Sequence, residues 1–303
     1  MTDTETPASK ETARNGFLMR AATYAAVAVA LSLIALKSWA YLVTDSVAIL
    51  STLVDSVLDL AASLVNLLAV RQALIPADDD HRFGHGKAEA LAGLFQSAFI
   101  VGSAIFLLLH AGERLLKPTS IEAGHIGIWI MVTSIAMTLC LVLFQRYVVR
   151  RTGSVAISAD SIHYAGDLLV NLSVIVALIL ISQLGWIYAD AIFAIGIALY
   201  ITYNAWSIIR MSFADLMDEE LPDEEREKIE AVVLSQRHVL GVHELRTRRS
   251  GQNVFVQMHI DLPPELTLME AHRISELVEQ AVLDLYPNAE ALIHQDPYPM
   301  TEG

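Results

Sequence analysis

The chain has 303 residues, of which 54% are hydrophobic and 18% are charged. Disordered chains are poor in apolar residues and rich in charge, so this composition excludes one, and the long apolar runs exclude a single water-soluble domain. A net charge of −14 argues against nucleic acid as a partner. The one cysteine excludes an intramolecular disulfide and a multi-cysteine zinc cluster. The composition therefore indicates a membrane protein.

Six segments are apolar and long enough to cross about 30 Å of hydrocarbon, which takes about 20 helical residues. We expect these spans at residues 17–36, 46–74, 88–110, 125–147, 159–182 and 186–209. Residues 1–16 are polar and lack the apolar core and the small-residue cleavage site of a signal peptide, so we expect the first span to be retained. The sequence thus predicts a polar N-terminal segment, residues 1–16, followed by an all-α, six-helix transmembrane domain over residues 17–212.

The last part of the chain differs from the rest in charge and in pattern. Residues 215–303 hold 19 acidic and 7 basic residues, a net charge of −12, and five of the ten histidines. Helical patterns at residues 222–237 and 267–286 alternate with strand patterns at 242–249, 253–262 and 290–295. We therefore predict a separate α+β domain over residues 213–303, with the order αββαβ and both helices on one face of a small sheet.

Lys and Arg residues near the span ends predict the orientation, because cytoplasmic loops carry an excess of both. One side of the membrane would carry eight of them: Lys10, Arg14, Arg71, Arg82, Lys87, Arg146, Arg150 and Arg151. The other side would carry three, namely Lys37, Arg114 and Lys117. Both termini, and with them the acidic domain, are predicted to be cytoplasmic.

Two spans are interrupted by a pair of ionisable residues, and such groups at membrane depth face a cavity or a partner. Asp55 and Asp59 lie in the second span, and His163 and Asp167 in the fifth, each pair spaced i, i+4 on one helical face. Three carboxylates and one imidazole suit Zn²⁺, and the absence of a thiolate disfavours Cu(I). Protonated, hydrogen-bonded carboxylates or a proton path without metal are the alternatives. Asp160 is predicted to be a structural first-turn acid of its helix.

Two further groups of metal-ligand side chains lie outside the spans. In the loop that Pro76 opens, Asp78, His81 and His85 can surround a second ion, although a solvated acidic turn explains the spacing equally well. In the strand at 253–262, alternation places His259 on the polar face. A third metal site, in the soluble domain, would draw on His243, His259, His272, His294 and Asp296. A single histidine is more often an exposed surface residue without a ligand, but the set together favours a metal site.

Three of these segments resemble motifs of one known family. They read Leu-Val-Asp-Ser-Val-Leu-Asp at 53–59, His-Tyr-Ala-Gly-Asp at 163–167 and Pro-Ala-Asp-Asp-Asp-His-Arg-Phe-Gly-His-Gly-Lys-Ala-Glu at 76–89. The family is the cation diffusion facilitators, specifically the YiiP-like zinc/iron efflux antiporters of bacteria. The resemblance runs from about residue 15 to residue 297 and implies six spans with a cytoplasmic αββαβ domain.

The resemblance also implies roles for the residues singled out above. It assigns Asp55, Asp59, His163 and Asp167 to a transport site and Asp78, His81 and His85 to a loop site. It places His243, His259, His272, His294 and Asp296 in a binuclear site at the interface of a homodimer. It further implies a charge pair of Lys87 with Asp218 that links the membrane and soluble parts.

The function implied is proton-coupled antiport that exports divalent transition metals from the cytoplasm of a bacterium, across its inner membrane. Zn²⁺ is the expected cargo and regulatory ion, with Fe²⁺ and Cd²⁺ as alternatives. A membrane metal sensor that does not transport would need only the sites outside the spans. An intramembrane metalloenzyme would need an open coordination position and a general base. The sequence has no His-Glu-x-x-His motif, so we expect no enzymatic activity.

Overall fold

The computed structural model describes residues 7–116 and 125–298 of the chain. The chain forms two compact units. The first, the helical unit, comprises Asn15–Pro76 and Ala88–Phe213. The second, the α+β unit, comprises Met1–Arg14, Ala77–Lys87 and Ala214–Gly303, so the loop after the second span belongs to it. Lys117 and residues 1–6 of the predicted N-terminal segment lie outside the described residues.

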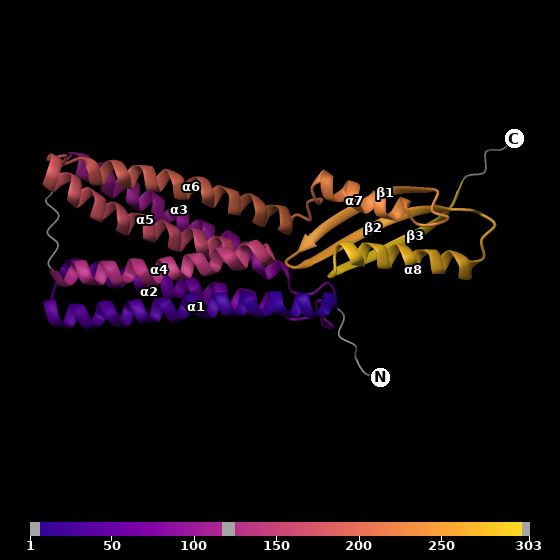
Figure 1. The fold of residues 1–303 in the computed structure, drawn as a ribbon, viewed down its shortest axis with the longest axis horizontal. Helices are drawn as coiled ribbons and strands as arrows, with labels where there is room; N and C mark the ends of the chain where they lie inside the picture. Colours follow the sequence, from indigo (N-terminus) through magenta and orange to yellow (C-terminus); the bar gives the residue numbers. More distant parts are fainter. Residues whose placement is uncertain (1–6, 117–124, 299–303) are drawn as a thin grey trace. The chain divides into compact units, whose positions relative to one another are not determined.

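Six long helices make up the helical unit and confirm the predicted architecture (Figure 1). They are α1 (Pro7–Thr44), α2 (Val47–Ala73), α3 (Lys87–Leu116), α4 (His125–Thr152), α5 (Val155–Leu184) and α6 (Ala189–Leu216). All six are long and apolar enough to cross a membrane. Most exceed the predicted spans at one or both ends, because hydropathy marks only the hydrocarbon core and a helix continues through the headgroup region.

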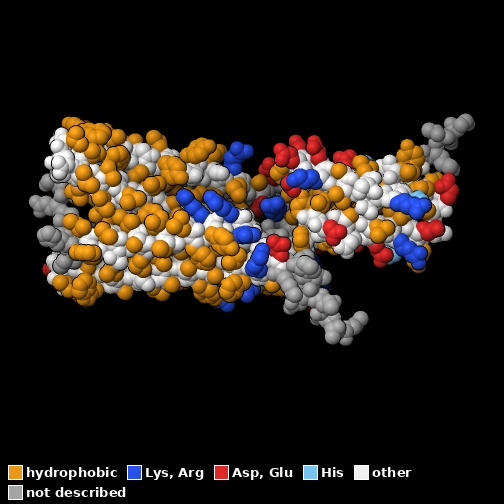
Figure 2. Space-filling view, viewed as in Figure 1, with side chains coloured by type: hydrophobic (Ala, Val, Ile, Leu, Met, Phe, Trp, Pro, Cys, Tyr) orange, Lys and Arg blue, Asp and Glu red, His pale blue; other side chains and the backbone are white. Residues whose placement is uncertain are grey.

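The outer surface of the helical unit is apolar, as a lipid-facing surface must be. Large side chains such as Leu42, Phe106 and Tyr203 are 82%, 66% and 77% exposed. Figure 2 shows hydrophobic side chains covering most of the visible face of this unit, with Lys and Arg gathered toward one end. Such a surface would be an aggregation hazard in water, so it indicates burial in a bilayer.

Small residues let the helices approach closely inside the unit. Ala104 of α3 packs in one buried cluster with Ala198 and Ala205 of α6. A Cβ on Gly93 of α3 would lie 2.7 Å from the Ser212 hydroxyl of α6, closer than side chains tolerate. Because lipid tails are as apolar as the helices, packing of this kind supplies much of the association energy in a membrane.

Capping residues define the ends of α5, the helix that carries His163. Gly153 leaves α4 in the left-handed conformation, with φ of 65°, and donates its backbone N–H to the Val149 carbonyl. Ser154 then caps α5 by accepting a hydrogen bond from the backbone of Ile157. At the other end Gly185 adopts φ of 67°, a left-handed C-cap.

Two residues lie in positions that differ from the sequence prediction. Lys37 was expected in a loop, but α1 continues to Thr44 and places Lys37 inside the helix. Asp160 was expected in the first turn of its helix. Because α5 begins at Val155, its first turn holds no acidic residue and Asp160 lies in the second turn, fully buried. The helix dipole therefore does not explain Asp160.

The α+β unit contains α7 (Asp223–Leu234), β1 (Gly241–Ser250), β2 (Asn253–Leu262), α8 (Leu268–Leu285) and β3 (Ala289–Pro297), the predicted αββαβ order. β2 is central, antiparallel to β1 and parallel to β3 (Figure 1). Both helices cover one face of the sheet, where Ile229, Val256 and Val278 are fully buried in a common core. The opposite face carries the histidines.

Candidate metal centres

The intramembrane group forms where α2 meets α5. Nε2 of His163 lies 3.1 Å from Oδ1 of Asp59 and 3.7 Å from Oδ2 of Asp167. One ligand atom from each of the three residues lies within 4.8 Å of the others. The geometry brings two carboxylates and an imidazole from two helices to one point, as the paired i, i+4 spacing predicts. Such a group can hold a divalent cation.

Asp55, the fourth predicted member, is not part of this group. It lies one turn earlier on α2, is exposed, and interacts electrostatically with Asp59 and with Lys37. Lys37 reaches across from α1 and donates hydrogen bonds to the Thr52 carbonyl at 3.0 Å and to the Ser56 hydroxyl at 2.7 Å. It also interacts electrostatically with Asp167. The aspartates of the intramembrane group therefore have a positively charged side chain beside them.

Further buried polar contacts continue from the intramembrane group along α5. Ser63 of α2 hydrogen-bonds Tyr164 of α5 at 2.8 Å. Gln145 of α4 donates to Oδ2 of Asp160 at 2.6 Å. Buried polar groups without partners are costly, so these contacts fix how α5 sits against α2 and α4. The segment of α5 that they join to α2 and α4 is the one that carries His163.

The loop group contains all three predicted residues. Oδ1 of Asp78 lies 3.1 Å from Nδ1 of His81, and its Oδ2 lies 3.3 Å from Nε2 of His85. The Asp78 carboxylate also accepts the backbone N–H groups of Asp80 and His81. The hydrogen bond from the His81 backbone, together with those from the side chain, lowers the pKa of Asp78. An ionised carboxylate beside two imidazoles can ligate a divalent cation.

Close contacts hold this loop against the β1–β2 turn. A Cβ on Gly86 would lie 2.2 Å from the Ser250 carbonyl oxygen, so only glycine fits there. The guanidinium of Arg248 packs against the rings of Phe83 and Phe255, 4.8 and 4.5 Å from their centroids, and the two rings contact each other edge to face. The loop group is therefore part of the α+β unit rather than a detached turn.

The predicted charge pair is present within the same unit. Nζ of Lys87 lies 2.9 Å from Oδ1 of Asp218, and Arg248 contacts the same oxygen at 3.2 Å. Burial alone would raise the pKa of Asp218, but the hydrogen bonds from Lys87 and Arg248 outweigh it and lower the pKa. Through Arg248 this pair joins the aromatic contacts of the loop.

The third group lies on the open face of the sheet, where strand register lines up its members. His243 of β1 is opposite His259 of β2, which is opposite His294 of β3. Asp296 lies 2.8 Å from Nδ1 of His259, 3.4 Å from His243 and 3.3 Å from His294. A hydrogen bond from His259 lowers the pKa of Asp296 first, and the charges of the surrounding histidines lower it further.

Two residues of this region were assigned differently by the sequence. Asp261 lies 3.5 Å from His243 but was not singled out, although its i+2 spacing from His259 puts it on the same face. His272 lies on α8, where its nearest acidic partner is Glu276 at 3.5 Å, away from the other four residues. Within one chain the structure brings together His243, His259, His294 and Asp296.

Comparison with known proteins supports a single class for this fold. The family described as "Cation efflux transmembrane domain" matches residues 23–217, and "Cation efflux protein, cytoplasmic domain" matches residues 221–298. The "Cation-efflux pump FieF" of Salmonella arizonae is 48% identical over 282 residues, 93% of this chain and 94% of that protein. Its namesake in Salmonella schwarzengrund is 48% identical over 290 residues, 95% of this chain and 96% of that protein.

A solved structure described as "Mode of Action of a Putative Zinc Transporter CzrB (Zn form)" is also similar. It is 34% identical, covers 28% of this chain and 99% of its own, and has a TM-score of 0.26.

Six apolar helices with ligand side chains between them, joined to an αββαβ domain, define a membrane transporter of metal cations. The chain belongs to the cation efflux family, the cation diffusion facilitators. Members of this family are transporters, so the expectation that the chain is not an enzyme is confirmed. The chain is accordingly a multi-pass membrane protein that exports metal cations.

Proposed function

We propose that the protein is a proton-coupled antiporter that exports divalent transition metals from the cytoplasm, with Zn²⁺ as the main substrate and Fe²⁺ or Cd²⁺ as alternatives. The observation that carries the proposal is the meeting of Asp59, His163 and Asp167 between two membrane-spanning helices. Carboxylate and imidazole ligands suit these borderline ions. Asp55, one turn away on the same helix, joins the group when the ion binds.

Proton coupling follows from the ligand chemistry. A metal ion binds ionised carboxylates and neutral imidazole, so its arrival displaces protons from the same atoms. With the group open to the cytoplasm the ion enters and protons leave. After the helices rock, the group opens to the outside, where protons compete for the ligands and release the ion. An inward proton gradient thereby drives metal outward, with His163 as the main proton carrier.

Lys37 offsets the charge of the carboxylates in this cycle. Three carboxylates with a divalent ion would carry a net negative charge at membrane depth, which is unfavourable. The Lys37 ammonium donates a hydrogen bond to Ser56, and Ser56 lies between Asp55 and Asp59 on α2. Its positive charge stabilises the carboxylates when no ion is bound and weakens the hold on the ion when one is. Release is easier for that reason.

The rest of the proposal concerns the α+β unit. We place the transmembrane domain at residues 17–212 and a cytoplasmic regulatory domain at residues 213–303, with both termini in the cytoplasm of a bacterium and the spans in its inner membrane. The exposed His272 would complete the histidine group from a second copy of the chain, giving a binuclear site in a homodimer. The loop group would bind a second ion, and the charge pair of Lys87 and Asp218 would link the membrane and soluble parts.

Zinc flux into proteoliposomes under an imposed proton gradient tests the central claim. We expect gradient-dependent flux in the wild type and none in Asp59→Asn or Asp55→Ala. Asp45→Asn is the matched control, because Asp45 lies in the turn before α2 at φ of 49°, a conformation that asparagine tolerates. If the wild type binds zinc but passes no divalent metal, the protein is a sensor and the proposal is wrong.

A further inference from the structure

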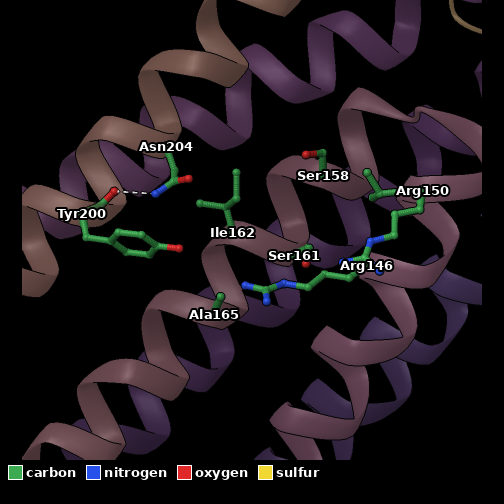
Figure 3. A pocket seen from close by; sticks show the side chains of 9 residues that line it. Arg146, Arg150, Ser158, Ser161, Ile162, Ala165, Tyr200 and Asn204 are labelled. Carbon is green, nitrogen blue, oxygen red and sulfur yellow. Dashed lines mark hydrogen bonds between the residues drawn. The ribbon is translucent and has the colours of Figure 1, made fainter.

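A cavity of about 260 Å³ lies between α4, α5 and α6 of the helical unit, apart from the three metal-ligand groups (Figure 3). Its polar lining consists of Arg146, Arg150, Ser158, Ser161, Tyr200 and Asn204. The remaining lining side chains are aliphatic, and the lining includes no acidic residue. A cavity with two cationic side chains and no carboxylate favours an anionic ligand.

Among the residues that the structure describes, none supplies a counter-charge to the two arginines of the cavity. Arg146 and Arg150 lie one turn apart on α4, and within residues 7–116 and 125–298 neither makes an ion pair or a side-chain hydrogen bond. Figure 3 shows Arg146 extended across α5 toward Tyr200 and Asn204 of α6. Their neighbour Arg151 instead packs over the Tyr147 ring, 5.9 Å from its centroid. One guanidinium group can bind two phosphate oxygens through two parallel hydrogen bonds.

The other polar residues of the cavity supply further hydrogen-bond partners. Ser158 and Ser161 lie one turn apart on α5, and Ser161 is buried. Figure 3 shows the Tyr200 hydroxyl facing the space between α5 and α6. The Asn204 amide is already in use, since it donates to the Tyr200 carbonyl at 2.7 Å. Hydroxyl donors beside paired arginines are the groups that a phosphate ester requires.

The size and surroundings of the cavity indicate where the phosphate comes from. Its volume is slightly below the range of about 300–1,000 Å³ that encloses whole drug-sized ligands, so a headgroup fits and the rest of its molecule lies outside. The helix surface beside it is apolar, with Leu143 on α4 and Leu199 and Tyr203 on α6 exposed. Arg146 and Arg150 are on the side predicted to be cytoplasmic. On that side, basic pockets between membrane helices bind anionic lipid headgroups.

We propose that this cavity binds the phosphate ester of an anionic glycerophospholipid, with its acyl chains against the exposed faces of α4 and α6. Arg146 and Arg150 bind the phosphate oxygens, and Ser158, Ser161 and Tyr200 complete the headgroup site. This site shares no residue with the metal-ligand groups.

Thermal unfolding of the purified full chain in mixed micelles tests the proposal. Phosphatidylglycerol should raise the Tm of the wild type above its value with phosphatidylcholine at the same mole fraction, because a ligand that binds the folded state stabilises it. The double variant Arg146→Gln, Arg150→Gln should lose at least half of that difference. Arg151→Gln is the control, because it removes a positive charge from the same helix outside the cavity lining, and it should keep the difference.

Three outcomes would overturn the proposal. The first is an equal rise of Tm in the double variant, which would show general attraction of anionic lipid to a basic surface. The second is a wild type with no lipid-dependent difference. The third is an equal rise with inorganic phosphate alone, which would assign the cavity to a free phosphate. If the double variant does not fold, Arg150→Gln and Arg146→Lys, analysed by mass spectrometry for retained phospholipid, replace it.

Discussion

Lys37 places a positive charge beside the intramembrane carboxylates, and its effect on metal binding can be measured at constant pH. At an effective dielectric constant of about 20, unit charges 4 Å apart interact by about 4 kcal/mol. Lys37→Met keeps the length of the side chain and removes this repulsion of a bound divalent ion. We expect Zn²⁺ to bind at least about tenfold more tightly in titration calorimetry, since tenfold corresponds to about 1.4 kcal/mol.

Lys37→Arg provides the control for this prediction, because it keeps the charge and changes the shape. Its zinc affinity should stay near that of the wild type. Unchanged or weaker binding in a folded Lys37→Met variant would show that Lys37 only joins α1 to α2 through Ser56 and Thr52.

His163 is the residue on which proton coupling is expected to depend. Imidazole is the side chain that ordinarily changes charge between pH 5 and 8, and His163 contacts both Asp59 and Asp167. His163→Ala should therefore weaken the dependence of zinc flux on the imposed pH gradient. His110→Ala is the control, since His110 is on α3, where its ring packs beside Phe106. Zinc flux with an unchanged number of protons per ion in His163→Ala would refute this role.

Sequence patterns predict some of these residues well and others poorly, for physical reasons. The i, i+4 pairs identify the faces that meet, because helical period fixes which side chains share a face. The contact of Lys37 with the intramembrane group could not be predicted from spacing, since its partners are on another helix and only the fold brings them together. The prediction for Asp160 is wrong because Ser154 caps the N-terminus of α5, and hydropathy does not detect such a cap. Asp261 had a usable signal in its spacing from His259.

At the scale of elements, the loop and the β1–β2 turn form one structure that a single methyl group should disrupt. In Gly86→Ala the new Cβ meets the Ser250 carbonyl, and backbone cannot move aside as a flexible side chain can. We expect a loss of about 1–3 kcal/mol of stability, typical of overpacking. Faster hydrogen exchange over residues 77–87 should accompany it. Gly112→Ala on α3 is the control, because nothing lies within 4 Å of its Cβ position.

The ion pair of Asp218 with Lys87 and Arg248 should make stability depend on pH. The pKa of Asp218 is lowered in the folded chain, so the pair stabilises the fold above the ordinary carboxylate pKa and is lost as pH falls through the lowered value. Asp218 is part-exposed, which limits the effect to about 0.5–1 kcal/mol. Asp218→Asn should lower the Tm at pH 7, and by progressively less as the pH falls through the lowered pKa. Asp223→Asn, which breaks the exposed pair with Arg226, should have a smaller effect over the same range.

Element order was predictable because local patterns agree with one another in this chain. β2 alternates between the buried core and the histidine face, and α8 begins at a capping box made by Thr267 and Glu270. The packing of the 77–87 loop against the sheet was not predictable. It depends on the close contact of Gly86 with Ser250 and on the packing of Arg248 against two aromatic rings, and neither leaves a periodic signal.

At the scale of the whole molecule, the charge of the C-terminal part opposes association of two chains. Residues 215–303 carry a net charge of −12, so two such domains repel each other unless cations intervene. Divalent ions at the histidine groups would offset part of that charge and draw ligands from both copies. We expect the distance between spin labels on the two C-terminal domains to shorten as zinc is added.

Zinc can shorten this distance in two ways, by offsetting the negative charge and by drawing ligands from both copies. A change of salt concentration separates these two contributions. Raising the ionic strength screens the repulsion between exposed charges, with a Debye length of about 10 Å at 0.1 M, so it should shorten the distance in part without zinc. His259→Ala removes the histidine that contacts Asp296 most closely and should abolish the response to zinc while keeping the response to salt. His238→Ala, outside the histidine groups, should keep both. A distance that zinc leaves unchanged at every salt concentration would show that the domain does not sense metal by association, and the regulatory part of the proposal would then fall without affecting the transport site.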